Sequence, residues 1–133
     1  MYASLVLLII IFVSFGCKSD TILLTAPVNP GDDVSFSTDV DPIFQASCSG
    51  SGCHIGQTTN GVNLSSYDSV INSIAASYNK DAVIPSDAAG SPLVDKLGVS
   101  PEFGSRMPSG GAALSTLQID TIRRWIDDGA INN

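Results

Sequence analysis

The sequence predicts an all-α domain of short helices joined by long loops. Several short stretches carry apolar residues at helical spacing with capping residues at their ends, and none alternates apolar and polar residues as a half-buried strand does. Gly, Pro and Ser are frequent between these stretches. The chain has 133 residues, which is enough for one domain with one modest core.

Two helices are expected in the first half of the domain. Asp39 is a suitable N-cap for a helix that ends at Ser47, and Pro42 would lie in its first turn, where a missing N–H is tolerated. A second helix is expected from about Ser66 to Ser77. Its apolar residues recur at helical spacing and share one face: Tyr67, Val70, Ile71, Ile74 and Ala75.

Two further helices are expected in the second half. A short one follows Ser91, with Pro92 at its first position and Gly98 as its C-terminal stop. The last helix has Ser115 as its N-cap, and Gln118 three residues later completes a capping box. Its buried face is expected to consist of Ile119, Ile122, Trp125 and Ile126.

Residues 1–16 resemble a signal peptide of the lipoprotein type. Their apolar run from Leu5 to Phe15 spans 11 residues, whereas a helix that crosses a bilayer needs about 20. The run ends in Ser-Phe-Gly-Cys, and small residues before a cysteine are typical of the site where bacterial lipoproteins are cleaved and lipidated. We expect lipidation at Cys17. A secretory signal cleaved elsewhere, or an uncleaved anchor, is the alternative.

The segment that follows, residues 17–34, contains Pro, Gly and Asp without a sustained period. This composition is typical of a tether, and the folded domain is expected to cover residues 35–133. An exported chain with a lipidated cysteine would lie in the periplasm or cell envelope, anchored to a membrane by its lipid.

The charge of the chain excludes some partners. It has 6 Lys and Arg against 13 Asp and Glu, a net charge of −7. This balance argues against nucleic acid, whose binding depends on neutralised phosphates, and against a polybasic patch on a membrane surface. A protein partner that is steered by charge is expected to present a basic face.

The strongest functional signal is the stretch SCSGSGCHIG at residues 47–56, which holds Cys48, Cys53 and the single histidine, His54. A structural zinc site needs four ligands, and the sequence offers three, two of them adjacent. A nucleophilic Cys–His pair needs a base that faces the thiol, whereas adjacent side chains diverge. A disulfide in an exported chain explains the two cysteines but not the histidine.

Covalent haem is the fourth interpretation. In the C-x-x-C-H motif the two thiols bond to the haem, and the histidine after the second cysteine becomes an axial ligand of the iron. The gap here is four residues rather than two, and all four are Ser or Gly, which accommodate a bulge at little steric cost. The Cys-His adjacency is retained in Cys53-His54.

A haem c needs a second axial ligand or an open position. Met107, followed by Pro108, is the only methionine besides Met1, and it lies in the Gly-, Pro- and Ser-rich loop 100–113. Its place in a loop rather than on an apolar stripe makes Met107 the candidate ligand, and a core-filling side chain is the alternative. Ligation by His and Met raises the reduction potential of the iron.

The order of these motifs resembles the small single-haem cytochrome c domains described as planctomycete-type, which are common in exported bacterial proteins. The resemblance runs from about residue 35 to 131 and rests on Asp-Pro-Ile at 41–43, Cys-His at 53–54, Ser-Pro-Leu at 91–93, Arg-Met-Pro at 106–108 and Trp-Ile at 125–126. It implies a cytochrome c-like fold wrapped around one covalent haem. It also implies thioethers from Cys48 and Cys53, with His54 as the proximal ligand and Met107 as the distal one.

Four other residues have weaker claims. Leu64 and Tyr67 either line the haem pocket or belong to the plain core. Trp125 either packs near a haem edge or anchors the last helix. Arg106 either pairs with a haem propionate or is a solvated loop residue.

An iron with both axial positions filled has no room for a substrate. The expected function is therefore electron transfer between redox proteins by one His/Met-ligated haem c, and not catalysis. One alternative is a haem-bearing redox subunit or accessory module of a larger envelope enzyme complex. Another is a lipoprotein without haem that carries a Cys48–Cys53 disulfide.

Overall fold

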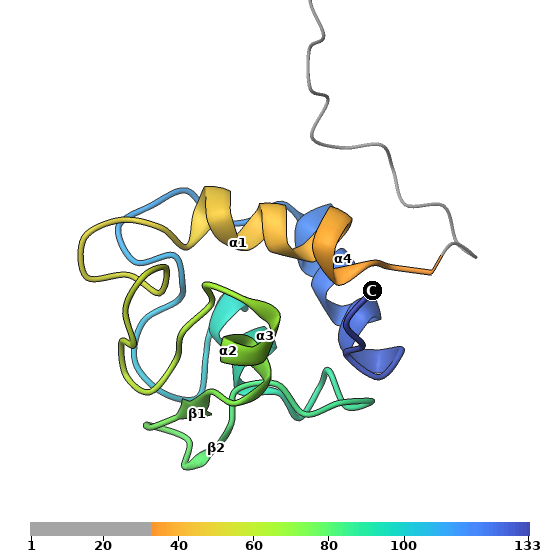
Figure 1. Cartoon of the computed structure of the whole chain (residues 1–133). Coiled ribbons are helices and arrows are strands. Elements are labelled where there is room, and N and C mark those ends of the chain that lie inside the picture. The colour runs from red at the N-terminus through yellow and green to blue at the C-terminus, as the bar shows by residue number, and fades with distance from the viewer. Residues whose placement is uncertain (1–32) are drawn as a thin grey trace, which may run out of the picture.

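The computed structural model describes residues 33–133 (Figure 1). In chain order the elements are the π-helix η1 (Phe36–Val40), α1 (Asp41–Ser47), α2 (Tyr67–Ile71), β1 (Ile74–Ala75), β2 (Lys80–Asp81), α3 (Pro92–Leu97) and α4 (Thr116–Asp127). The expected signal peptide, the lipidation site Cys17 and the tether up to residue 32 lie outside the described residues. Within residues 33–133, no helix has the length and apolar character that crossing a membrane requires.

The first helical segment begins earlier than the sequence predicts, and Asp39 is not its N-cap. Ser35 is the cap: its hydroxyl accepts from the N–H of Thr38, while its own N–H donates to Oδ2 of Asp39 at 2.8 Å. The side chain and backbone of Asn133 accept from the N–H groups of Phe36 and Ser37. A residue almost a hundred positions away thus satisfies donors that a helix start leaves unpaired. α1 continues from η1 and ends at residue 47, as predicted.

The second helix is shorter than predicted, because α2 starts after its cap Ser66 but ends at residue 71. The hydroxyl of Ser73 donates to the carbonyls of Asn63 and Ser69 and accepts from the N–H of Asn63 at 2.9 Å. Such bonds from a side chain to the backbone compete with helix continuation. Residues 74–75 instead pair with residues 80–81 as the antiparallel strands β1 and β2, which the sequence did not predict.

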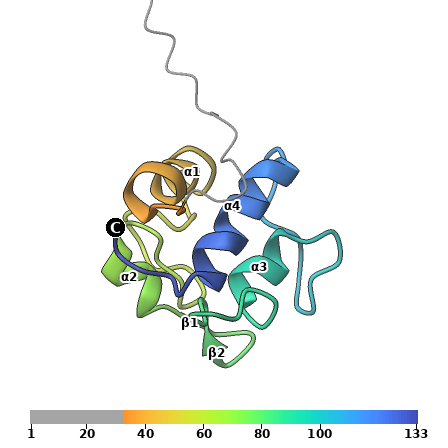
Figure 2. The same cartoon turned by 90° about the vertical axis from the view of Figure 1, so that its right-hand side faces the viewer.

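α3 and α4 lie where the sequence predicts them. Ser91 and Gly98 flank α3, and the capping box of Ser115 and Gln118 at the start of α4 has both of its hydrogen bonds. Figure 2 shows α4 between α1 and α3. Its predicted inner face is buried, with Ile119 only partly so: Ile122, Trp125 and Ile126 are fully enclosed.

An aromatic cluster joins α4 to the first helical segment and to α2. The ring of Phe36 lies 5.2 Å from that of Trp125 and 5.3 Å from that of Tyr67, measured between centroids. Phe44 extends the cluster with a ring 6.5 Å from Phe36. Fully buried large side chains therefore gather around α4, and a long loop follows the C-terminal end of α1.

Candidate functional site

The segment from Cys48 to His54 leaves the end of α1 and closes into a compact loop. The N–H of Cys48 still donates to the carbonyl of Phe44, at 2.8 Å, and the N–H of His54 donates back to the carbonyl of Cys48, at 3.1 Å. Gly50 and Gly52 adopt φ values of 127° and 79°. Residues with a side chain are strained at such positive φ values, so the two glycines in the four-residue gap make this turn possible.

His54 is fixed at three points. Besides its N–H bond, its carbonyl accepts from the N–H of Leu64 at 2.8 Å, and its ring atom Nδ1 lies 3.2 Å from the carbonyl oxygen of Val62. A carbonyl only accepts, so Nδ1 carries the hydrogen and the lone pair of the neutral ring lies on Nε2. Metal-binding histidines are oriented in this way, by donating from one nitrogen and binding the metal with the other.

Cys48 and Cys53 are half-buried free thiols. Burial chiefly, and the nearby charge of a Cys53 thiolate in addition, raises the pKa of Cys48 to about 11. The Cys48 thiol is therefore protonated at neutral pH, and a protonated, buried thiol is a poor nucleophile. This environment gives no support to a nucleophilic Cys–His pair. It suits a sulfur that remains uncharged in an apolar site.

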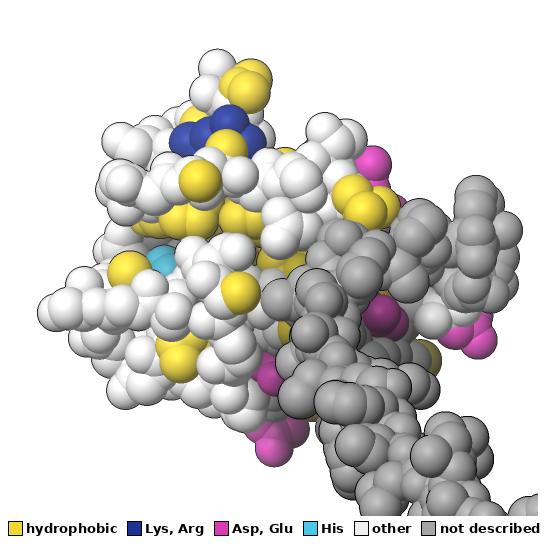
Figure 3. All heavy atoms as spheres, turned by 90° about the horizontal axis from the view of Figure 1, so that it is seen from above, with side chains coloured by type: hydrophobic (Ala, Val, Ile, Leu, Met, Phe, Trp, Pro, Cys, Tyr) yellow, Lys and Arg dark blue, Asp and Glu magenta, His cyan; other side chains and the backbone are white. Residues whose placement is uncertain are grey.

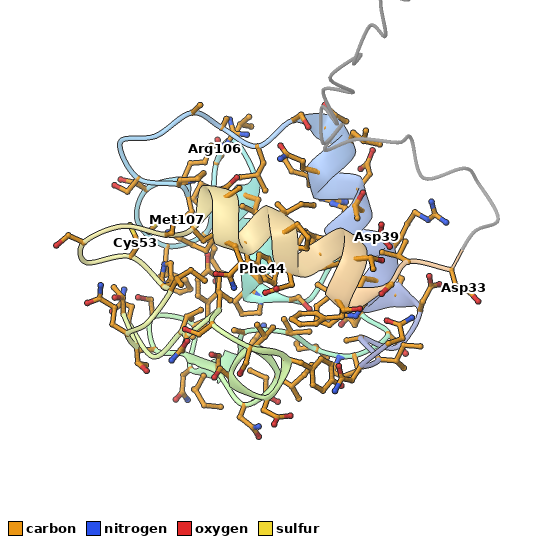
Figure 4. The ribbon with its side chains drawn as sticks, turned by 45° about the horizontal axis from the view of Figure 1, so that its top comes forward. Asp33, Asp39, Phe44, Cys53, Arg106 and Met107 are labelled. Carbon is orange, nitrogen blue, oxygen red and sulfur yellow. The ribbon has the colours of Figure 1, made fainter. Side chains whose placement is uncertain are left out.

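Met107 reaches this end of the molecule from the loop that follows α3. Its N–H donates to the carbonyl of Lys96 at 2.8 Å, and Nε of Arg106 donates to the carbonyl of Leu97 at 3.0 Å. Figure 4 shows Met107 and Cys53 at the same end of the first helical segment, remote from Asp39. The Met107 side chain is half-buried and lies outside the hydrophobic core cluster, so it is not a core filler.

Cys48, His54 and Met107 line one cavity. Its empty volume is about 670 Å³, including its opening to solvent. The other lining residues are mostly apolar: Asn60, Val62, Leu64, Ala75, Ala76, Ser77, Tyr78, Ala82, Pro92, Leu93, Lys96 and Leu97. In Figure 3 a histidine side chain is visible inside a hollow with apolar atoms along its wall.

The remaining predicted residues have distinct places. Cys53 is not among the cavity-lining residues, although it belongs to the same loop as Cys48. Leu64 lines the cavity, whereas Tyr67 belongs to the aromatic cluster and donates its hydroxyl to the carbonyl of Ala130 at 2.9 Å. Trp125 anchors the last helix, and its Nε1 donates to the carbonyl of residue 131. Arg106 is bonded to the backbone rather than freely solvated.

Sequence reasoning missed three contributors to the site. Val62 acts through its backbone carbonyl, which no residue pattern reveals. Tyr78 and Lys96 line the cavity from the β1–β2 turn and from α3. Lys96 lies in the short helix that the sequence predicts after Ser91, but nothing in the sequence places the β1–β2 turn beside that helix.

The donor set fits a haem better than a bare ion. Within residues 33–133, no three His, Cys, Asp or Glu side chains gather in a way that could hold a metal ion. An imidazole with Nε2 available and a thioether, which here line one mostly apolar cavity, are ligand types that hold haem iron in c-type cytochromes. His54 and Met107 would bind the iron, and Cys48 would bond to the porphyrin.

Comparison with known proteins found little similarity. No protein-family model matches the chain, and no curated protein matches it. Among solved structures, a chain of hydrazine synthase from Kuenenia stuttgartiensis is similar with 23% sequence identity and a TM-score of 0.46. The match covers 73% of this chain and 16% of that chain, so this protein spans less than a fifth of the length of its neighbour.

Proposed function

We propose that this protein is an electron carrier with one covalent haem c and a cytochrome c-like fold. Cys48 and Cys53 form the thioethers, and His54 and Met107 are the axial ligands. One observation carries the proposal: the first cysteine and the histidine of the motif, from one loop, and a methionine from another loop line the same mostly apolar cavity. When bound, the haem supplies an iron centre that gains and loses one electron.

The residues of the chain determine how such a centre behaves. The bond from His54 Nδ1 to the carbonyl of Val62 orients the ring and raises the basicity of Nε2. The Met107 thioether would favour the reduced state of a bound haem iron, and the mostly apolar lining would limit water there. With two protein ligands, no position is open for a substrate, so the site transfers electrons and performs no catalysis. Cys53 would bond from the loop that it shares with Cys48.

The proposal includes a place in the cell. A lipoprotein signal over residues 1–16, lipidation at Cys17 and a tether would hold the domain at a membrane, in the periplasm or cell envelope. Its partners would then be redox proteins of the same compartment. The acidic composition of the chain favours partners with a basic docking face.

A haem stain after denaturing electrophoresis tests the cofactor. The full chain is expressed in a host with cytochrome c maturation machinery, beside a Cys48→Ser/Cys53→Ser variant as the matched control. We expect stain that survives denaturation in the parent and none in the variant. An exported parent chain that lacks stain in two hosts with different maturation systems contradicts the proposal, and an intact mass lower by two hydrogens identifies a disulfide instead. Stable co-purification with a larger enzyme would identify a redox subunit rather than a free carrier.

A further inference from the structure

A hydrogen-bond cluster fastens the loop that leads to Met107. The hydroxyl of Tyr78, in the turn between β1 and β2, donates to Oδ2 of Asp95 on α3. The same carboxylate oxygen accepts from the N–H of Glu102 at 2.8 Å. The rings of Tyr78 and Phe103 meet edge to face, with centroids 4.8 Å apart. Asp95 thus joins three segments: the β1–β2 turn, α3 and loop 98–106.

Lys96 binds the same loop from the next position of α3. Its Nζ donates to the carbonyl of Phe103 at 2.7 Å and to that of Ser105 at 2.6 Å. Its own carbonyl accepts from the N–H of Met107. We call Tyr78, Asp95 and Lys96 the clasp. The clasp thus holds the loop at several points between Glu102 and Met107.

The loop has little packing of its own. Val99 is 85% exposed and Phe103 is 41% exposed, so apolar burial contributes little to its position. Its place therefore depends on the polar bonds of the clasp. Those that end on the carboxylate of Asp95 are of the stronger, charge-assisted kind.

We propose that Tyr78 is a positioning residue for Met107. Its bond to Asp95 ties loop 98–106 to the turn on another wall of the cavity and so holds the Met107 thioether over the cavity. Lys96 and Asp95 fasten the loop to α3, which is the element that the loop leaves. Tyr78, through its hydroxyl and its ring, joins this assembly to the β1–β2 turn, which also lines the cavity. The consequence for the iron rests on the function proposed above.

Tyr78→Phe isolates the hydroxyl, because the ring and its contact with Phe103 remain. Tyr67→Phe is the matched control: it also removes one bonded phenol hydroxyl, but from the aromatic cluster and outside the cavity lining. In the haem-loaded protein we expect Tyr78→Phe to weaken the absorption band of the oxidised protein that reports the sulfur–iron bond. It should also let carbon monoxide bind the reduced iron and lower the reduction potential. Tyr67→Phe should leave all three unchanged.

Amide hydrogen exchange supplies a readout that does not depend on the iron. Loss of a hydrogen bond to a charged acceptor should speed the exchange of the Glu102 and Met107 amides about three- to tenfold in Tyr78→Phe. Asp95→Ala removes both bonds to the carboxylate and should have a larger effect on exchange and on the sulfur–iron band.

The outcomes distinguish failure of the Tyr78 proposal from failure of the proposed function. A chain without covalent haem overturns the proposed function, and the role of Tyr78 with it. Haem attached with the sulfur–iron band, the potential and carbon monoxide binding unchanged in both Tyr78→Phe and Asp95→Ala overturns this inference alone. That result would stand even if amide exchange were faster, because the clasp would then fasten the loop without positioning the ligand.

Discussion

The region around α4 and the region around the cavity are stabilised in different ways. Around α4, large apolar side chains fill the space between elements, and Trp125 and Ile126 have no exposed surface. Around the cavity, apolar side chains form walls but do not fill the space, and hydrogen bonds to the backbone fix the loops. The first region is a packed core in its own right. The second surrounds a cavity that opens to solvent, and we expect it to gain most of its rigidity when the proposed haem binds.

Trp125→Ala should strongly destabilise the region around α4. The side chain is fully buried, its ring packs against Phe36, and its Nε1 donates to the carbonyl of residue 131. We expect the free energy of unfolding to fall by about 3–5 kcal/mol, as measured by urea denaturation. Val99→Ala is the control, because at 85% exposure it should cost at most about 0.5 kcal/mol. Equal losses for both variants would show that α4 is not the centre of the stable region.

Met107→Ala should act on the second region and spare the first. In the haem-free chain we expect the free energy of unfolding to change by less than about 1 kcal/mol, because this half-buried side chain lies outside the core cluster. In the haem-loaded protein the reduction potential should fall, and carbon monoxide should bind the reduced iron. Met107→Leu controls for lost volume. An unchanged potential in Met107→Ala removes Met107 from the ligand set.

Ser115→Ala sharpens the comparison at the start of α4. The change removes the hydroxyl that accepts from the N–H of Gln118 in the capping box. We expect a loss of about 1 kcal/mol in the free energy of unfolding, with the potential of the haem-loaded protein unchanged. The exposed Ser109 provides the control substitution to Ala. A shift in potential would show that the two regions are coupled.

The smallest effect should come from pH. Burial first, and then the hydrogen bond to Asp95, raises the pKa of Tyr78 from 10.0 to about 12. The folded state thus favours the protonated hydroxyl. The stabilisation that this provides is fully present below pH 10 and is lost as pH rises through 12. The difference in unfolding free energy between the parent and Tyr78→Phe should shrink over that range. A constant difference would show that the hydroxyl does not titrate with the bond.

The sequence predicted the elements whose signals are local. The cap and capping box of α4 lie within four residues, and Ser91, Pro92 and Gly98 mark α3. Elements that depend on distant residues were predicted wrongly. The start of η1 depends on Asn133, and the end of α2 depends on the bonds that Ser73 makes ten residues back at Asn63.

The candidate site divides in the same manner. Cys48, His54 and Met107 could be proposed as candidates from residue types and spacing, and the structure places all three on one cavity. The contacts that position these side chains could not be predicted from the sequence. The partner of His54 is a backbone carbonyl, and the bond from Tyr78 to Asp95 spans 17 residues. Haem attachment itself stays a prediction.

The direction from which the chain enters the domain has one more consequence. Figure 4 shows Asp33 at one end of the first helical segment and Cys53 and Met107 at the other. If residues 17–34 hang from a lipid at Cys17, the domain is suspended by the end remote from its cavity. Cys53 and the cavity residue Met107 would then lie on the side of the domain away from the point where the tether enters. Soluble redox partners would then reach the cavity more readily than partners embedded in the membrane.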